Sequence, residues 1–359
     1  MRLVALLKRK RFWIAASFGV FILVYTIKKA DLETLLDNLQ DIGRLWAIVA
    51  TIASFLSYLC IAAVLHSLLK SMNHTLPFSS TFRISLLSCT LNYIWAMGGL
   101  SGVAAKVYLL AKENIPAGRT LSISMVHGFL TNTVAVLFIY LGFFFFYSKN
   151  KMNAEQMELA VVVLVVAFAF TWLTIQTMIH ESFRKRLWQF LLAISNAVCR
   201  KLRRPHWIKK DRAENFFKHF NENMNLLVKN FRVLLAPASY ALLDWFFMFL
   251  CLKCSFSAVH YPVDNWTLLV GFSVGIFANL FSLTPASIGI MEGSMAASFY
   301  LMGLDYNRAL LATLLYRFAY FFLPILVSIF YYKEFFRSSV EEIEVEENPK
   351  RSEPTTMGH

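Results

Sequence analysis

The amino-acid sequence predicts an all-α integral membrane protein, with about six full membrane spans and two re-entrant helical hairpins in an inverted-repeat arrangement. Of its 359 residues, 57% are hydrophobic and 16% are charged. Several apolar runs reach the roughly 20 residues that a membrane helix needs, and two shorter runs are interrupted by glycine or proline. Because the helices require most of the apolar residues, we expect no separate soluble catalytic domain.

The excess of basic residues fits a membrane protein better than a nucleic-acid-binding protein. The formal net charge is +13, and Lys and Arg concentrate in the cytoplasmic loops of membrane proteins. The sequence has no His/Cys cluster with metal-ligand spacing, no P-loop, and no G-x-S-x-G or H-E-x-x-H motif. We therefore expect no metal, no cofactor, no nucleic-acid partner and no enzymatic activity.

The first two spans place the N-terminus in the cytoplasm. Lys8–Arg11 precedes an apolar run, Phe12–Ile27, that lacks a small-residue cleavage site and is expected to remain as a span. Asp31–Arg44 carries leucines at helical spacing and predicts an amphipathic helix at the outer surface. Leu45–Leu69 then returns to a cytoplasmic loop, Ser71–Arg83.

The next segment predicts the first hairpin, which enters from the cytoplasmic side. Ile84–Met97 and Val103–Ala111 are each too short to cross a hydrocarbon core of about 30 Å as a helix. The second half carries Lys106, and Asn92 in the first half is expected to make a helix–helix hydrogen bond or to line a polar cavity. The expected break contains three glycines: Gly98, Gly99 and Gly102.

Two further spans, Leu121–Tyr147 and Met157–Ile179, lead to a basic segment, Glu181–Arg232, whose charge keeps it in the cytoplasm. Within this segment, apolar residues at helical spacing predict an amphipathic helix on the inner leaflet, where anionic lipid would attract it. A solvated loop is an equally good interpretation. The apolar residues are Leu187, Phe190, Leu191, Ile194 and Val198.

The last part of the chain predicts two spans, Val233–Leu252 and Ala309–Tyr332, and a disordered acidic tail, Lys333–His359, in the cytoplasm. Between the spans, Trp266–Met302 predicts the second hairpin, which enters from outside. Its first apolar run stops at a proline and small residues, and its return run is too short to cross alone. Two short spans with a proline kink are the alternative, because Pro and Gly are common in membrane helices.

In this scheme residues 1–332 form one membrane domain, whose halves, about 12–180 and 233–332, have the same order of parts in opposite orientation. Broken segments at matching positions of inverted halves indicate a transport site. A short internal match accompanies the inversion, since Ser101–Val103 resembles Ile288–Ile290.

Four charged residues fall inside predicted membrane segments: Lys106, Asp244, Glu292 and Arg317. Charges at this depth are costly and are usually paired and functional. One interpretation is structural pairing, for example of Glu292 with Arg317. The other is a polar cavity in which Arg317 and Lys106 bind a lipid phosphate. Asp244 is then expected to be a counter-ion or a proton site.

The turn around Pro285 would complete such a cavity. A helix that starts here offers free backbone N–H groups and the positive end of its dipole, with Thr284 as the N-cap and Pro285 in the first helical position. Ser287 and Gly289 belong to the same turn. His127 is expected either to titrate in the cavity or to be a satisfied histidine of the helix bundle.

These motifs resemble the lysylphosphatidylglycerol synthase transmembrane-domain family, also called flippase-like. The resemblance covers about residues 12–332. Its second half is carried by Pro285, Gly289-Ile290-Met291-Glu292, Gly303 and Arg317, and its first half by Gly98-Gly99, Gly102, Lys106 and Tyr108. The first half departs from the family pattern: Ala104 and Ala105 stand where the family often has an acidic residue, and Lys106 and His127 stand where it often has Arg.

The resemblance implies a flippase-like transporter that moves a phosphate-bearing lipid, either an aminoacyl-phospholipid or a polyprenyl-linked lipid, across the cytoplasmic membrane. In long family members a cytosolic aminoacyl-transferase domain follows, which we do not expect here. The alternatives are a non-catalytic scaffold that partners a lipid- or glycan-modifying enzyme, and an integral-membrane transferase, against which the missing motifs count. A transporter would depend on the hairpin charges, and a scaffold on residues 181–232.

Overall fold

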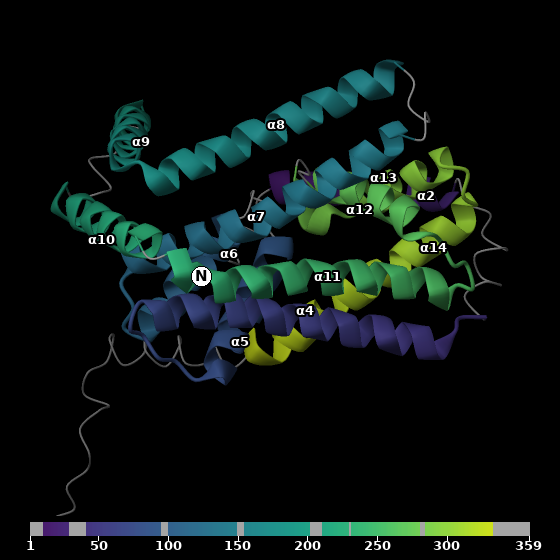
Figure 1. Cartoon of the computed structure of the whole chain (residues 1–359), viewed down its shortest axis with the longest axis horizontal. Helices are drawn as coiled ribbons and strands as arrows, with labels where there is room; N and C mark the ends of the chain where they lie inside the picture. The colour runs from purple at the N-terminus through teal and green to yellow at the C-terminus, as the bar shows by residue number, and fades with distance from the viewer. Residues whose placement is uncertain are drawn as a thin grey trace, which may run out of the picture.

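The computed structural model describes residues 10–28, 41–94, 100–148, 154–201, 210–229, 231–280 and 284–332. These residues fold almost entirely into helices, and none of them forms a strand (Figure 1). The expected glycines Gly98 and Gly99, most of the amphipathic segment before residue 41, and the tail from residue 333 lie outside the described residues.

Among the described residues, four helices are long and apolar enough to cross a membrane, so the prediction of an α-helical integral membrane protein is confirmed. Each coincides with one of the six expected spans. α2 (Lys10–Lys28) and α8 (Ala154–Ile179) coincide with the other two, whose role as full spans stays a prediction. The four helices are α4 (Arg44–Ser71), α7 (Ala117–Ser148), α11 (Leu235–Ala258) and the helix that begins with α14 (Tyr306–Arg317) and continues to Tyr332.

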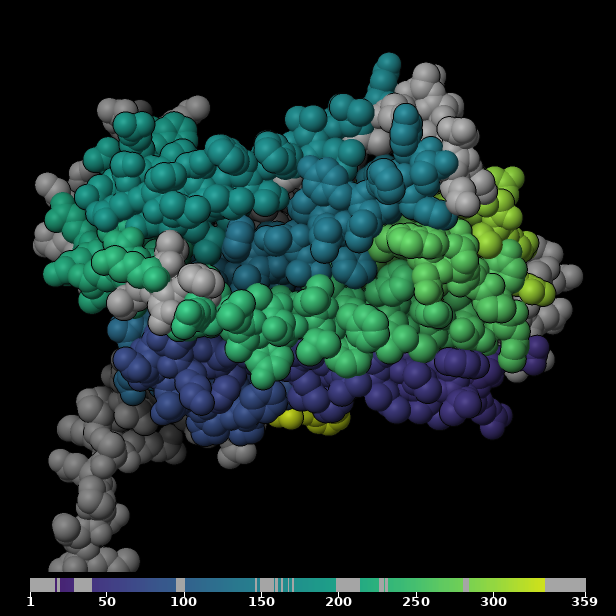
Figure 2. Space-filling model, viewed as in Figure 1, coloured from purple at the N-terminus to yellow at the C-terminus, as the bar shows by residue number. Residues whose placement is uncertain are grey.

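α4 and α11 form an antiparallel pair and lie side by side along most of their length, with α4 at the lower edge of the view (Figures 1 and 2). The backbone N–H of Gly43 donates to the carbonyl of Ala258 at 2.8 Å, so the start of α4 meets the end of α11. The buried face of α4 is rich in small side chains such as Ala50, Ala53 and Ser57, which allow the two backbones to come close.

The first predicted hairpin is a pair of antiparallel helices, α5 (Phe78–Ile94) and α6 (Leu100–Lys112). Two boundaries were predicted wrongly. α5 begins within the expected loop, and Gly102 belongs to the first turn of α6 and not to a break. A Cβ on Gly102 would lie 3.0 Å from the carbonyl oxygen of Ser88, so this glycine lets α6 pack tightly on α5.

The second predicted hairpin consists of α12 (Asn265–Leu280) and α13 (Ile290–Leu301), which are also antiparallel. Gly271 faces the ring of Phe299, and one turn later Gly275 faces Met295. With 16 and 12 residues, these helices extend about 24 and 18 Å, less than the roughly 30 Å of a hydrocarbon core. These lengths fit a re-entrant arrangement, which itself stays a prediction.

The basic segment contains two helices, α9 (Glu181–Lys201) and α10 (Lys210–Lys229). α9 turns sharply away from α8, at 108°, and α10 packs against the start of α7, where the Ser122 hydroxyl donates to the carbonyl of Phe220 at 3.1 Å. The predicted amphipathic helix is therefore present as α9. Three of its expected apolar side chains are exposed: Phe190, Leu191 and Ile194.

Candidate functional site

The break between α12 and α13 is a compact, buried turn. Pro285–Ser287 forms a single 3₁₀ turn with Thr284 as its N-cap, and α13 begins only at Ile290, with Gly289 as N-cap. The expected N-cap, Thr284, and first helical position, Pro285, are therefore present, but they begin a 3₁₀ turn and not the expected longer helix. The physical reason is backbone conformation: Ala286 and Ser287 have φ of 55° and 53°, in the left-handed region, which no α-helix can accommodate.

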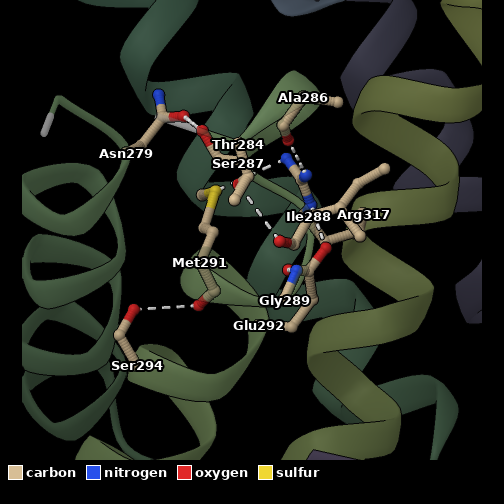
Figure 3. A network of polar contacts seen from close by, with 10 residues as sticks. All are labelled: Asn279, Thr284, Ala286, Ser287, Ile288, Gly289, Met291, Glu292, Ser294 and Arg317. Atoms are coloured by element: carbon tan, nitrogen blue, oxygen red, sulfur yellow. Dashed lines mark hydrogen bonds and ion pairs between the residues drawn. The ribbon is translucent and has the colours of Figure 1, made fainter. Parts of the chain in front are cut away.

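Arg317 holds this turn from the neighbouring helix (Figure 3). Its Nε donates to Oε1 of Glu292 at 2.7 Å, and its Nη2 donates to the carbonyl oxygen of Ala286. The other carboxylate oxygen of Glu292 accepts the backbone N–H of Gly289 at 2.8 Å, which caps α13. We call Arg317, Glu292 and the Ala286 carbonyl the hairpin latch.

The hairpin latch is closed and buried. Glu292 and Arg317 are each 1% exposed. The backbone N–H groups of Ser287, Ile288 and Gly289 all have intramolecular acceptors, so the free donors expected at this turn are already bound. The structure thus contains the ion pair that the structural interpretation predicts. In this conformation Arg317 has no surface on which a phosphate could bind.

A π-helical turn, Phe318–Phe322, follows directly after Arg317. The guanidinium of Arg317 lies over the ring of Phe321, 3.9 Å from its centroid, and a stacked cation of this kind is held by the electron-rich face of the ring. Single π-turns within α-helices are frequent at functional sites. This one places Phe321 and Tyr320 on the sides of the helix that face the hairpin latch and α4 respectively.

The two hairpins meet at this point. α5 contacts the turn Pro285–Ser287, and the ring of Tyr93, near the end of α5, packs edge-on against Phe321 at 4.7 Å between centroids. The hydroxyl of Ser101 donates to the side-chain oxygen of Asn92 at 3.2 Å, which confirms the expected helix–helix hydrogen bond between α5 and α6. Residues about 200 positions apart in the sequence are thus in contact where the two hairpins meet.

Lys106 and His127 form a second, more open cluster. Nζ of Lys106 on α6 lies 3.5 Å from Nδ1 of His127 on α7. His127 is buried, whereas Lys106 is half-buried. No carboxylate forms an ion pair with Lys106 among the described residues, where ion pairs join Glu181 to Lys185, His219 to Glu222 and Glu292 to Arg317. The structure therefore assigns Lys106 and Arg317 to separate clusters.

Asp244 lies on α11, where this helix packs against α4, and its contacts are with neutral groups. The hydroxyl of Ser57 on α4 donates to Oδ1 of Asp244, and lies 3.0 Å from the hydroxyl of Tyr320 in the π-turn. The hydroxyl of Tyr58 donates to the carbonyl of Tyr320 at 3.0 Å. No cation pairs with Asp244 in the described part of the chain, so its role as a counter-ion or a proton site stays a prediction.

Two features were missed by the sequence interpretation. One is the tyrosine network around Asp244, for which the spacing of Tyr316 and Tyr320 on either side of Arg317 was an available signal. The other is Arg184, which in the sequence is only one of several basic residues in the segment Glu181–Arg232. It is 2% exposed and joins α8, α9 and α10. It donates to the side chains of Asn221, at 2.7 Å, and Asn225, and to the carbonyls of Thr177 and Met178 at the end of α8.

A comparison with protein-family models gives a match to the lysylphosphatidylglycerol synthase TM region over residues 12–328. The chain belongs to this family. The match includes both hairpins, the hairpin latch and the Lys106–His127 cluster, so every charged cluster described above is part of the family's membrane region. A comparison with curated proteins gives no match. Within the described residues, no group of three or more His, Cys, Asp or Glu side chains is arranged to hold a metal ion.

Proposed function

We propose that this member of the lysylphosphatidylglycerol synthase TM family translocates a phosphate-bearing lipid across the cytoplasmic membrane, with Lys106 as the contact for the lipid phosphate. The lipid is an aminoacyl-phospholipid or a polyprenyl-linked lipid, and both carry the phosphate that Lys106 would bind. Membership of this family supports a role in lipid modification or transport, and the long apolar helices support a location in the membrane. Translocation needs no catalytic group in this chain.

The observation that carries the proposal is the uncompensated cation on α6. A lysine in a membrane-embedded helix normally has an acidic partner, but the described partner of Lys106 is the imidazole of His127. A half-buried ammonium group without a carboxylate can be neutralised by a lipid phosphate. Lys binds phosphate as a point charge, which suits a headgroup that has to leave again.

The hairpin latch would have a different role in this mechanism. In the closed conformation the guanidinium of Arg317 donates its hydrogen bonds to Glu292 and to the Ala286 carbonyl. A lipid phosphate could replace them only after the turn opens. We therefore propose that Lys106 binds the headgroup first and that Arg317 receives it when α13 moves, while Ser287 and Gly289 become available as donors. Two re-entrant hairpins in inverted orientation, with cytoplasmic N- and C-termini, would supply the alternating access that this requires.

The test is lipid binding by the purified protein. Mass spectrometry should find a phosphate-bearing lipid bound to the unmodified protein. Lys106→Gln should weaken binding of phosphatidylglycerol or of a polyprenyl phosphate by about 10- to 100-fold, the loss of one charged hydrogen bond, and Lys106→Arg should retain most of it. Lys112→Gln, which changes an exposed lysine on the same helix, is the control. Equal binding by Lys106→Gln would refute the assignment.

A scaffold function has one observation in its favour, the α9–α10 unit that Arg184 holds together. Its exposed apolar side chains, Phe190, Leu191 and Ile194, could dock a partner enzyme. If the protein is a scaffold, Lys106→Gln should preserve activity in cells, while replacing these three side chains with Ser should abolish it. The transporter proposal predicts that Lys106→Gln abolishes activity.

A further inference from the structure

The buried carboxyl group of Asp244 is not used by the lipid-binding proposal. It lies in α11, at the interface with α4, and is 6% exposed. Among the described residues, its hydrogen-bond donor is a neutral hydroxyl, that of Ser57. An ionised carboxylate in a membrane interior is costly without a cation, whereas a protonated one is not. Such a group exchanges a proton whenever a path to water opens.

The surroundings of Asp244 contain hydroxyl and thiol groups from three helices, and no charged group among the described residues. Around the neighbouring Trp245, α7 and α12 contribute the aromatic rings of Phe138 and Phe272. The ionisable groups within electrostatic reach of Asp244 are Tyr58 and Cys60 on α4, Cys89 and Tyr93 on α5, and Tyr316 and Tyr320 on the helix after Asp305.

We propose that Asp244 is a proton-binding site, and that its protonation is coupled to the hairpin latch through Ser57 and Tyr320. The chain of contacts is continuous. Ser57 bonds both Asp244 and the hydroxyl of Tyr320. Tyr320 lies in the π-turn that follows directly after Arg317, and Arg317 holds the turn of the second hairpin closed.

Protonation reverses the direction of these hydrogen bonds. When Asp244 is ionised, Ser57 must donate to it, and Tyr320 then donates to Ser57. When Asp244 is protonated, its own O–H can donate to Ser57, which frees the Ser57 hydroxyl to donate to Tyr320 and leaves the Tyr320 O–H without this acceptor. An unmade buried hydrogen bond destabilises the π-turn. The proton thus changes the turn on which Arg317 depends.

This inference rests on the proposed lipid transport and adds the proton as its driving ion. The first test detects the proton site alone and does not depend on lipid. Infrared difference spectra of the membrane-reconstituted protein, between mildly acidic and mildly alkaline buffer, should contain the carbonyl band of a protonated carboxylic acid. Asp244→Asn should remove the band. Asp305→Asn should keep it, because Asp305 is an exposed N-cap that Asn can replace. A band of unchanged intensity in Asp244→Asn, or no band in the unmodified protein, would overturn the proposal.

Ser57→Ala provides a test that does not require the acid to be removed. Without the hydrogen bond from Ser57, the carbonyl band should persist and move to higher frequency. An unmoved band would show that the titrating acid is a different residue.

The coupling to the hairpin latch is tested with vesicles of phosphatidylglycerol and phosphatidylcholine that contain a fluorescent phosphatidylglycerol. Lipid movement in the unmodified protein should depend on an imposed pH gradient. Tyr320→Phe should remove this dependence while leaving the infrared band of Asp244 in place. If movement in Tyr320→Phe still follows the gradient, the coupling route is wrong. If the band is present but no variant or pH moves lipid, the transport proposal fails and the proton site stands.

Discussion

The hairpin latch gives the sharpest prediction about stability. Arg317→Gln leaves Glu292 buried with one hydrogen bond, from the Gly289 N–H, and no counter-charge. With charge centres about 4 Å apart and an effective dielectric constant of about 20, the pair is worth about 4 kcal/mol. This agrees with the roughly 3–5 kcal/mol lost when one partner of a buried pair is removed. The melting temperature should then fall by roughly 4–7 °C.

The double variant tests whether the two residues act as a pair. Glu292→Gln in the Arg317→Gln background removes the unpaired charge, and a glutamine at position 292 can still accept the N–H of Gly289 and bond the glutamine at 317. We expect the double variant to be about 2–3 kcal/mol more stable than the sum of the single changes predicts. Arg308→Gln, an exposed change on the same helix, should lie within about 0.5 kcal/mol of the unmodified protein.

The assay is thermal unfolding of the detergent-solubilised protein, followed by size-exclusion chromatography with fluorescence detection. Strictly additive losses in the double variant would refute the pairing, and so would an Arg317→Gln variant as stable as Arg308→Gln. A double variant that regains stability but binds no lipid would show that the charges also have a role in transport. Restored stability together with unchanged lipid binding would make the pair purely structural.

The remaining predictions concern helix packing and sidedness. Gly271→Ala should cost about 1–3 kcal/mol in the same assay, because its Cβ would lie 2.2 Å from the buried ring of Phe299. Gly128→Ala, where no atom lies within 4 Å of the new Cβ, should be neutral or stabilising by up to about 1 kcal/mol, and equal losses at the two sites would contradict the packing. For sidedness, a membrane-impermeant thiol reagent applied to intact cells should label Asn265→Cys and not Ser195→Cys, in variants without other accessible cysteines. Labelling of Ser195→Cys from outside would refute a cytoplasmic position for α9.

Sequence reasoning located the helices well because apolar runs in a membrane protein are dictated by the solvent around them. The predicted helix boundaries were wrong at the places where local backbone geometry determines where a helix begins. Pro285 is a good helix-start signal, but the left-handed conformations of Ala286 and Ser287 arise from contacts with other helices. Gly102 was read as a breaker, whereas its lack of a side chain serves a close approach to Ser88.

The sequence identified the charged and amide residues of the membrane segments but not the contacts between them. Glu292, Arg317, Lys106, Asp244 and Asn92 were all identified, since charged and amide groups are conspicuous in apolar segments. Their partners depend on which helices are neighbours in space, and neither composition nor spacing reports that.

The role of Arg184 could not be predicted for the same reason. Two of its acceptors, Asn221 and Asn225, lie about 40 residues further along the chain. In the sequence, Arg184 is one basic residue in a segment that contains many.

The left-handed backbone of Ala286 and Ser287 has an energetic consequence for the second hairpin. For residues with a side chain, this conformation costs roughly 1–2 kcal/mol each, so the closed turn carries about 2–4 kcal/mol of strain. The ion pair that holds it closed is worth only slightly more. The strain in the backbone of the turn and the stabilisation from the ion pair are therefore nearly equal, so a small change in free energy is sufficient to open the turn. A ligand that replaced Glu292 as the partner of Arg317 would supply that free energy.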